Sequence, residues 1–266
     1  MFKIFFILLL FCSWAFSFTS ILVTYPVEYF FLKKIVDKEV YIKIVSENRL
    51  SFLNLDKQNI NILSKNHYYF NFDLDEERKL VKILKKDNSS IKTVNMVKGI
   101  QKLQLSNKKS NPYVWLDPIL ARDIAANIYK NMIKIIPSKK STFEKNYKQL
   151  LLQLDDIYLD IKSRIDKSDL YGFFCFNNQL DYFAKRFRIN IYHKKREILN
   201  PKEIKQLSSF SKKEYIKHIL VSKNSDFEVP IAYRSYIDGK IVEYDILSKD
   251  WKVNLYEILR GIEHFN

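Results

Sequence analysis

Histidine is the residue through which this sequence could most directly bind a transition metal or transfer protons near neutral pH. The four histidines, His67, His193, His218 and His264, lie far apart, and no two have the spacing that places a metal-binding pair on one helix face. We expect His67 to be structural. His193 follows a predicted strand, where ligands of open α/β sheets gather, so it is a candidate metal ligand.

Other chemical motifs are missing from the sequence. It contains neither the Gly-x-Ser-x-Gly nor the His-Glu-x-x-His pattern. Its four glycines never lie within five residues of one another, which excludes a P-loop and a dinucleotide fingerprint. Asp155 and Asp156 are expected on a solvated helix face. Asp73, Asp75 and Glu76 precede a basic helix, whose dipole they would complement. The sequence therefore predicts no enzyme.

The composition is that of a globular protein with one large domain or two small ones. Of 266 residues, 47% are hydrophobic and 28% are charged, and 45 Lys and Arg against 30 Asp and Glu give a net charge of +15. The lysines are spread along the chain and accompany no recognisable nucleic-acid module, so no nucleic-acid partner is expected. Most of the aromatic residues, 15% of the chain, are expected in the core.

Residues 1–17 have the pattern of a signal peptide. A lysine precedes an apolar run too short to span a bilayer, and Ala15–Ser17 provides a small-x-small cleavage site, which predicts export to the periplasm or cell envelope. A lipid anchor at Cys12 is disfavoured because the preceding Phe11 is not small. Cys175, the single cysteine of the mature chain, has no partner for an intramolecular disulfide, and we expect a buried thiol.

Residues 18–138 alternate strand and helix patterns, as is typical of a parallel sheet with helices on its faces. The segment opened by Asp117-Pro118 is predicted as a helix that ends before Pro137. The expected strands are Ile21–Tyr25, Val40–Val45, His67–Phe72 and a short one at Val94–Val97, and the expected helices before residue 117 are Val27–Val36, Ile60–Lys65 and Glu76–Lys86.

One long helix is predicted over residues 139–168. Its apolar stripe runs from Phe143 to Ile165 in steps of three and four residues, and Ser141 is the expected N-cap. A helix of about 28 residues is about 42 Å long, which is enough to reach across two lobes and hold them at a fixed distance.

Residues 169–266 repeat the strand and helix alternation. The predicted fold class is therefore α/β, with two β/α lobes of parallel-type sheets flanked by helices, one long rigid connecting helix, and a ligand cleft between the lobes. The expected strands are Tyr171–Phe176, Ile189–Tyr192, His218–Val221 and Lys240–Tyr244, and the expected helices are Gln179–Phe187, Pro201–Ser209, Ile231–Ile237 and Trp251–Glu263.

The segment Asn111–Pro118, NPYVWLDP, resembles a known family signature. That signature is Asn-Pro-His-x-Trp-Leu-Asp-Pro of the periplasmic solute-binding proteins that serve zinc and manganese ABC transporters. Val23–Ile35, Leu180–Phe187 and Asn200–Ile204 are similar to further segments of the family, and the resemblance spans nearly all of residues 20–260. It implies two lobes joined by a rigid helix, a monomer, a metal between the lobes, and an ABC transporter permease as partner.

The resemblance also implies where ligand-binding residues lie. The family holds its ion with three histidines and one carboxylate, and these positions fall on Ser51, Tyr113, Asn177 and Asp245, of which Asp245 alone is retained. Hydroxyl and amide oxygens are weak neutral donors, and a phenol must lose a proton before it ligates well. We therefore expect these four residues to line a cleft in which zinc or manganese binds weakly or not at all, with Asp245 or His193 as metal ligands.

Two functions follow from this pattern. The first is an exported solute-binding component of a zinc- or manganese-type ABC transporter, which captures a metal or another small ligand between its lobes. The alternative is a surface or periplasmic interaction protein, similar to an adhesin, that keeps the scaffold without transport. A transporter component predicts ligand-dependent lobe closure, whereas an adhesin predicts binding that ignores small ligands and weakens with salt.

Overall fold

The structure of the protein is a computed structural model. It describes residues 19–48, 51–52, 54–105, 109–168, 170, 172–193, 201–223 and 234–263. The predicted signal peptide, Cys12 and His264 lie outside the described residues.

Strands and helices alternate along nearly the whole described chain. The strands are β1 (Ser20–Val23), β2 (Tyr41–Ile44), β3 (Tyr68–Asn71), β4 (Lys92–Asn95), β5 (Gly172–Cys175), β6 (Asn190–His193), β7 (His218–Ser222) and β8 (Lys240–Tyr244). The helices are α1 (Pro26–Val36), α3 (Lys57–Leu63), α4 (Asp75–Asp87), η1 (Val114–Leu116), α5 (Leu120–Ile135), η2 (Pro137–Lys139), α6 (Lys140–Asp166), α7 (Asp181–Phe187), α8 (Pro201–Lys213) and α10 (Trp251–Ile262).

Each half of the chain forms its own four-stranded parallel sheet. The first has the order β2-β1-β3-β4 and the second the order β6-β5-β7-β8, so both sheets have the same arrangement. We call the first sheet with its helices the first lobe and the second the second lobe. The predicted class of two parallel β/α lobes is confirmed.

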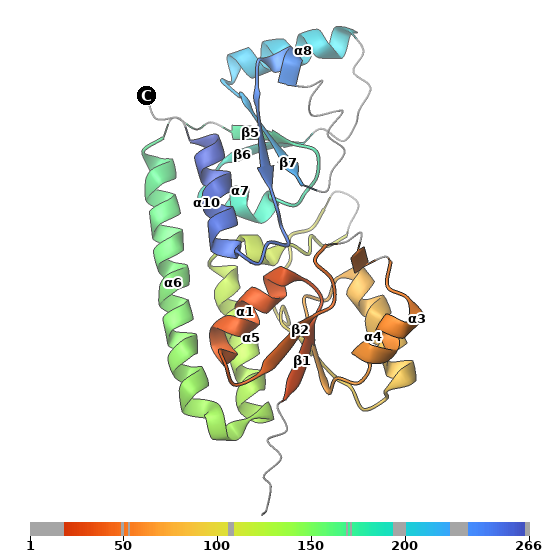
Figure 1. The fold of residues 1–266 in the computed structure, drawn as a ribbon. Coiled ribbons are helices and arrows are strands. Elements are labelled where there is room, and N and C mark those ends of the chain that lie inside the picture. The colour runs from red at the N-terminus through yellow and green to blue at the C-terminus, as the bar shows by residue number, and fades with distance from the viewer. Residues whose placement is uncertain are drawn as a thin grey trace, which may run out of the picture.

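Helices cover both faces of the first sheet (Figure 1). Alternation along the strands decides which residues meet which helices, because successive side chains point to opposite faces. Ile21 and Val23 belong to the core that α1 and α5 close, whereas Leu22 packs in a separate core with Leu63 of α3 and Leu84 of α4. Both faces are therefore buried, as in other parallel sheets.

The long helix α6 joins the two lobes along one side of the molecule (Figure 1). It packs against α1 and α5 of the first lobe and against α7 and α10 of the second. The predicted long helix is confirmed, and its apolar stripe is largely buried, with Tyr147 as the partly buried position. The buried stripe residues are Phe143, Leu150, Leu154, Ile157, Ile161 and Ile165. The predicted N-cap is wrong: η2 leads directly into α6, so Ser141 lies in its first turn and Lys139 holds the cap position.

One hydrophobic core continues through both lobes. The buried indole of Trp115 donates a 2.8 Å hydrogen bond to the carbonyl of Ile246, and the buried indole of Trp251 donates one of 2.8 Å to the carbonyl of Trp115. Trp115 also stacks on Phe72 of the first lobe, and Trp251 packs edge-on against Phe31 of α1. The lobes are thus joined by desolvated indoles as well as by α6.

Several predicted boundaries differ from the structure by two or more residues, as at α3 and α8. The strand expected at Val94–Val97 is β4, which begins and ends two residues earlier, because its pairing partner β3 fixes the register from Lys92. The helix expected from Asp117 is α5, which begins at Leu120 after a turn in which the Asp117 carboxylate accepts the backbone N–H groups of Ile119 and Leu120. The separate 3₁₀ turn η1 ends just before Asp117. Of the predicted helix Ile231–Ile237, the described residues 234–237 are helical.

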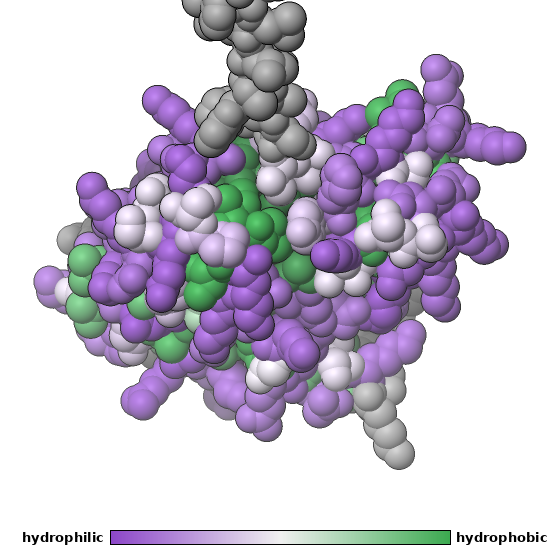
Figure 2. Space-filling model, turned by 90° about the horizontal axis from the view of Figure 1, so that it is seen from below, coloured by the Kyte–Doolittle hydropathy of each residue, from purple (hydrophilic) through white to green (hydrophobic). Residues whose placement is uncertain are grey.

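The surface is hydrophilic over most of the face seen in Figure 2, with hydrophobic side chains gathered near the middle. Within the described residues, every helix is too short or too polar to form a transmembrane span. The Cys175 thiol is buried, as predicted, and burial raises its pKa to about 11, so it is protonated at neutral pH.

The Trp251 indole offers a test of the joint between the lobes. Trp251→Phe removes its N–H and leaves the buried carbonyl of Trp115 without that donor, so we expect a loss of about 2 kcal/mol in the free energy of unfolding, measured in urea. The matched control is Val253→Ala on the same helix, where a 48% exposed side chain predicts a change within about 0.5 kcal/mol. Equal losses in both variants would contradict this role.

Candidate functional site

The carboxyl ends of the strands in both sheets border one cleft. In an open parallel sheet, ligands bind beyond the carboxyl ends of the strands where the strand order reverses, which is between β1 and β3 in one lobe and between β5 and β7 in the other. Tyr25 follows β1, Asp73 follows β3 and Asn177 follows β5, and all three line one cavity. The topology therefore builds the site from both lobes.

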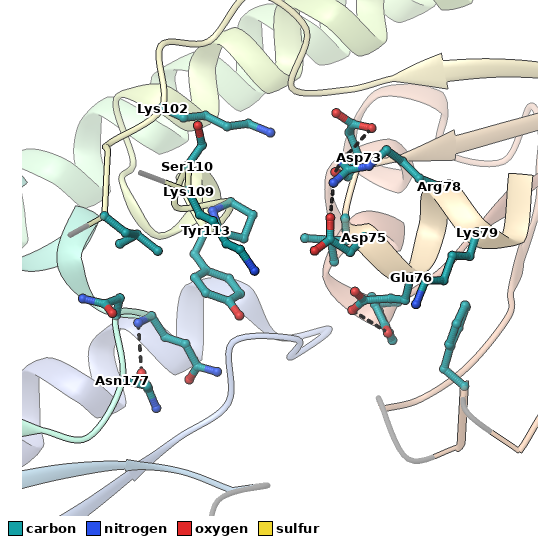
Figure 3. Close-up of a pocket in the computed structure, with 17 residues that line it drawn as sticks. Asp73, Asp75, Glu76, Arg78, Lys79, Lys102, Lys109, Ser110, Tyr113 and Asn177 are labelled. Carbon is teal, nitrogen blue, oxygen red and sulfur yellow. Dashed lines mark hydrogen bonds and ion pairs between the residues drawn. The ribbon is translucent and has the colours of Figure 1, made fainter. Parts of the chain in front are cut away.

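This cavity has a volume of about 1040 Å³ and is open to solvent. Figure 3 shows its two walls, with acidic and basic residues of the first lobe facing lysines, Tyr113 and Asn177. The lining residues are Tyr25, Phe52, Asp73, Leu74, Asp75, Glu76, Arg78, Lys79, Lys102, Leu105, Lys109, Ser110, Pro112, Tyr113, Asn177, Asn178 and Gln179.

The first wall is the beginning of α4. Asp73 has a φ of 60°, a left-handed conformation that aspartate tolerates better than most residues, and it turns the chain from β3 into the helix. Arg78 lies 3.1 Å from the Asp73 carboxylate and also pairs with Asp75. Glu76 accepts a 3.3 Å hydrogen bond from the Tyr25 hydroxyl. The carboxylates of this wall are therefore largely engaged by neighbouring donors.

The opposite wall includes the segment that carries Lys102, Lys109 and Tyr113. Backbone hydrogen bonds join Leu105 to Lys109 and Asn111 to Leu103, which folds this segment back on itself. Its anchor is the fully buried Asn111, whose amide donates to the carbonyl of Asn178, at 2.6 Å, in the second lobe. The wall is thus fixed to both lobes.

Asn177 uses its amide oxygen inside the protein. Its Oδ1 accepts the backbone N–H of Gln179 at 2.9 Å and lies 3.1 Å from the Tyr244 hydroxyl, which is also 2.9 Å from Oε1 of Gln179. Burial raises the pKa of Tyr244 well above its ordinary value, so the phenol keeps its proton and donates. The oxygens of both amides are therefore turned to internal donors.

The structure brings together only part of the predicted ligand set. Tyr113 and Asn177 line the same cavity, whereas Ser51 and Asp245 are not among its lining residues. Ser51 donates its hydroxyl to the side chain of Asn48. The Asp245 carboxylate accepts the backbone N–H of Leu247 at 2.9 Å and so stabilises the turn after β8.

His193 lies at the end of β6 and is not part of the cavity lining. Its Nε2 is 2.9 Å from Oδ1 of Asp181, whose other oxygen accepts hydrogen bonds from Asn111 and Asn178. This partner orients the imidazole within the second lobe. A role for His193 as a metal ligand stays a prediction.

A bare zinc ion does not fit the donors that the cleft presents. In the described part of the chain, no three His, Cys, Asp or Glu side chains cluster in a way that could hold a metal. Tyr113 offers a phenol, which must lose a proton before it ligates well, and the oxygen of Asn177 already has two donors. Zinc prefers sulfur, imidazole nitrogen and carboxylate ligands in a tetrahedral set.

Comparisons with known proteins agree with this architecture. The profile of the family described as "ZnuA: Zinc-uptake complex component A periplasmic" matches residues 21–250, which include both sheets and α6. The chain belongs to this family. Among curated ZnuA proteins, the chain is similar to the high-affinity zinc uptake system protein of Buchnera aphidicola subsp. Schizaphis graminum, with 33% identity over 118 residues, and to that of Bacillus subtilis, with 30% identity over 77 residues.

These two alignments cover 42% and 29% of the chain, and 36% and 24% of the relatives' own lengths. The similarity in fold extends over a much larger part of the chain. A crystal structure of ZnuA has a TM-score of 0.83 at 21% identity and covers 92% of this chain and 98% of that one. A periplasmic metal binding protein from Candidatus Liberibacter asiaticus has a TM-score of 0.77 at 16% identity and covers 92% of this chain and 99% of that one.

The ZnuA-family signature at Asn111–Pro118 now has a structural explanation. Asn111 anchors the cleft wall, Trp115 enters the core shared by the lobes, and Asp117 pairs with Arg186 of α7 at 2.7 Å and 2.8 Å. Each of these contacts reaches the second lobe. The signature therefore maintains the joint between the lobes through residues other than Tyr113.

Sequence reasoning missed a pair of buried carboxyl groups behind the first wall. The Glu28 carboxylate accepts hydrogen bonds from the backbone N–H groups of Tyr25, at 3.0 Å, and Phe72, at 2.9 Å. The Glu77 carboxylate accepts hydrogen bonds from the backbone N–H of Leu74, at 2.8 Å, and from the Thr24 hydroxyl. Burial raises the pKa of both, and the neighbouring Glu77 charge raises that of Glu28 further. Glu77 looked like an ordinary first-turn acid, so no pattern in the sequence distinguished it.

This buried pair predicts a pH-dependent stability. Carboxyl groups with a raised folded-state pKa keep protons that the unfolded chain releases, so stability is present below the unfolded pKa and is lost as the pH rises through the folded one. We expect the free energy of unfolding to fall with pH by up to about 1.4 kcal/mol per pH unit for each retained proton. Glu77→Gln should flatten this slope, because the amide is neutral and can still contact Leu74 and Thr24.

Urea unfolding at several pH values measures the effect. Glu257→Gln is the matched control, because Glu257 is exposed on α10, and its slope should equal that of the unchanged chain. Identical slopes for Glu77→Gln and the unchanged chain would contradict the retention of a proton by these buried groups.

The replaced imidazoles give a second test. Tyr113→His combined with Asn177→His places two nitrogen donors on one cavity, so the double variant should bind Zn²⁺ about tenfold or more tightly than the unchanged chain in calorimetric titration. Lys85→His on the exposed face of α4 is the control and should add nothing. No gain over that control would show that these two positions do not converge on one ion.

Proposed function

We propose that the chain is the exported solute-binding component of a zinc- or manganese-type ABC transporter. It captures its cargo in the cleft between residues 18–138 and 169–266, which residues 139–168 connect, and presents the cargo to a membrane permease. The observation that carries this proposal is the family match over residues 21–250, together with a cleft built from the carboxyl ends of both sheets.

Further observations support the metal-transport assignment. The curated relatives are described as high-affinity zinc uptake proteins, and the solved relatives include a manganese-bound metal binding protein. The family is described as periplasmic, which agrees with a signal peptide at residues 1–17. A binding component of this type acts as a monomer by holding and releasing its cargo, so we expect no catalysis.

The alternative of an interaction protein similar to an adhesin has less support. An adhesin needs an accessible binding surface, whereas the distinctive groups of this chain line a cavity between its lobes. The comparisons also favour transport proteins over binding proteins of the cell surface.

Metal uptake in cells tests the proposal. Cells that lack their own zinc-binding component, but keep the permease and ATPase, should regain growth in chelator-treated medium and accumulate zinc or manganese when they produce the full chain. The matched control lacks residues 1–17 and should fail, because the folded protein stays on the wrong side of the membrane. Folded, exported protein that restores neither growth nor metal content would overturn the proposal.

A further inference from the structure

Building on the proposed function, we propose that the cleft binds a small polycarboxylate anion, free or carrying a divalent metal, and does not bind the bare metal ion. In the metal-carrying form, the carboxylates of the anion supply the metal ligands. The protein then needs to recognise the outside of the complex with cationic and hydrogen-bond-donating groups.

The charges of the cleft favour an anion. Four basic side chains and three acidic ones line the cavity, and Arg78 engages two of the three acids. Lys102 lies on the opposite wall, and no carboxylate of the described residues is within ion-pairing distance of it. A bare dication would enter a site with excess positive charge, whereas an anionic group can pair with Lys102.

The amides of Asn177 and Gln179, which line the same cavity as Lys102, also offer donors. Because Tyr244 and the backbone of Gln179 engage the amide oxygens of Asn177 and Gln179, each amide has its NH₂ group left for a ligand. In the described part of the chain, these two NH₂ groups make no hydrogen bond. Carboxylate oxygens accept such donors, whereas a metal ion requires the oxygens that are already used.

The size of the cavity agrees with an organic ligand. Zinc is held by atoms at about 2.0–2.3 Å, so a site for a bare ion must be narrow. A volume of about 1040 Å³ lies just above the range for small-molecule sites, which is about 300–1,000 Å³. A chelate fills more of this space than a bare ion does.

Calorimetric titration of the full mature chain, stripped of metal, tests the inference with four probes: Zn²⁺ alone, citrate alone, the zinc–citrate complex and inorganic phosphate. We expect heat from citrate, from zinc–citrate or from both, and none from Zn²⁺ alone. Stronger binding of the complex identifies a chelate as cargo, and equal binding identifies the free anion. Lys102→Gln should weaken the interaction about tenfold, because it removes a charged donor.

The control variant is Lys85→Gln, which removes the same charge from α4 outside the cavity and should leave the affinity unchanged. Stoichiometric binding of Zn²⁺ alone, no heat from either citrate probe, phosphate binding as tight as citrate, or equal effects of the two lysine variants would each overturn the inference. Metal uptake in cells without citrate binding would leave the proposed function intact. Citrate binding without metal uptake would support a polycarboxylate ligand and would contradict the proposed role in metal transport.

Discussion

The burial of two indoles at the junction of the lobes is the constraint on which the rest of the structure depends. Trp115 and Trp251 each need a hydrogen-bond acceptor in the core, and each finds a backbone carbonyl, of Ile246 and of Trp115 itself. These bonds hold the lobes in the relative position that the structure shows. With α6 alongside, that position fixes the distance between the two sheet edges, and therefore the width of the cleft.

Local pattern was sufficient to predict most of the fold. Strand and helix periodicities predicted the alternation in both halves, and the apolar stripe of α6 predicted a helix long enough to join them. The boundaries of β4 and α5 were predicted less accurately. Pairing with β3 fixes the ends of β4, and hydrogen bonds to the Asp117 carboxylate fix the start of α5. A local apolar pattern shows neither interaction. The predicted N-cap of α6, Ser141, was wrong because the 3₁₀ turn η2 leads directly into the helix, and the presence of a serine does not indicate such a turn.

The site was only partly predictable. Tyr113 and Asn177 lie on one cavity, as the family resemblance implied, because Tyr113 directly precedes η1 and Asn177 follows β5. Ser51 and Asp245 are not among its lining residues, and Lys102 had no motif to mark it. Glu28 and Glu77 meet only through tertiary packing, since 49 residues separate them and each has the character of an ordinary helix acid.

The shared strand order of the two sheets has a consequence for how this family changes. Each lobe supplies its own crevice, and the exposed side chains that line one wall can be replaced without disturbing the core that both lobes share. One half of the cleft can therefore change its chemistry while the other half and the indole joint stay as they are. A receptor built in this way can acquire a different cargo by surface substitutions alone, without any change of architecture.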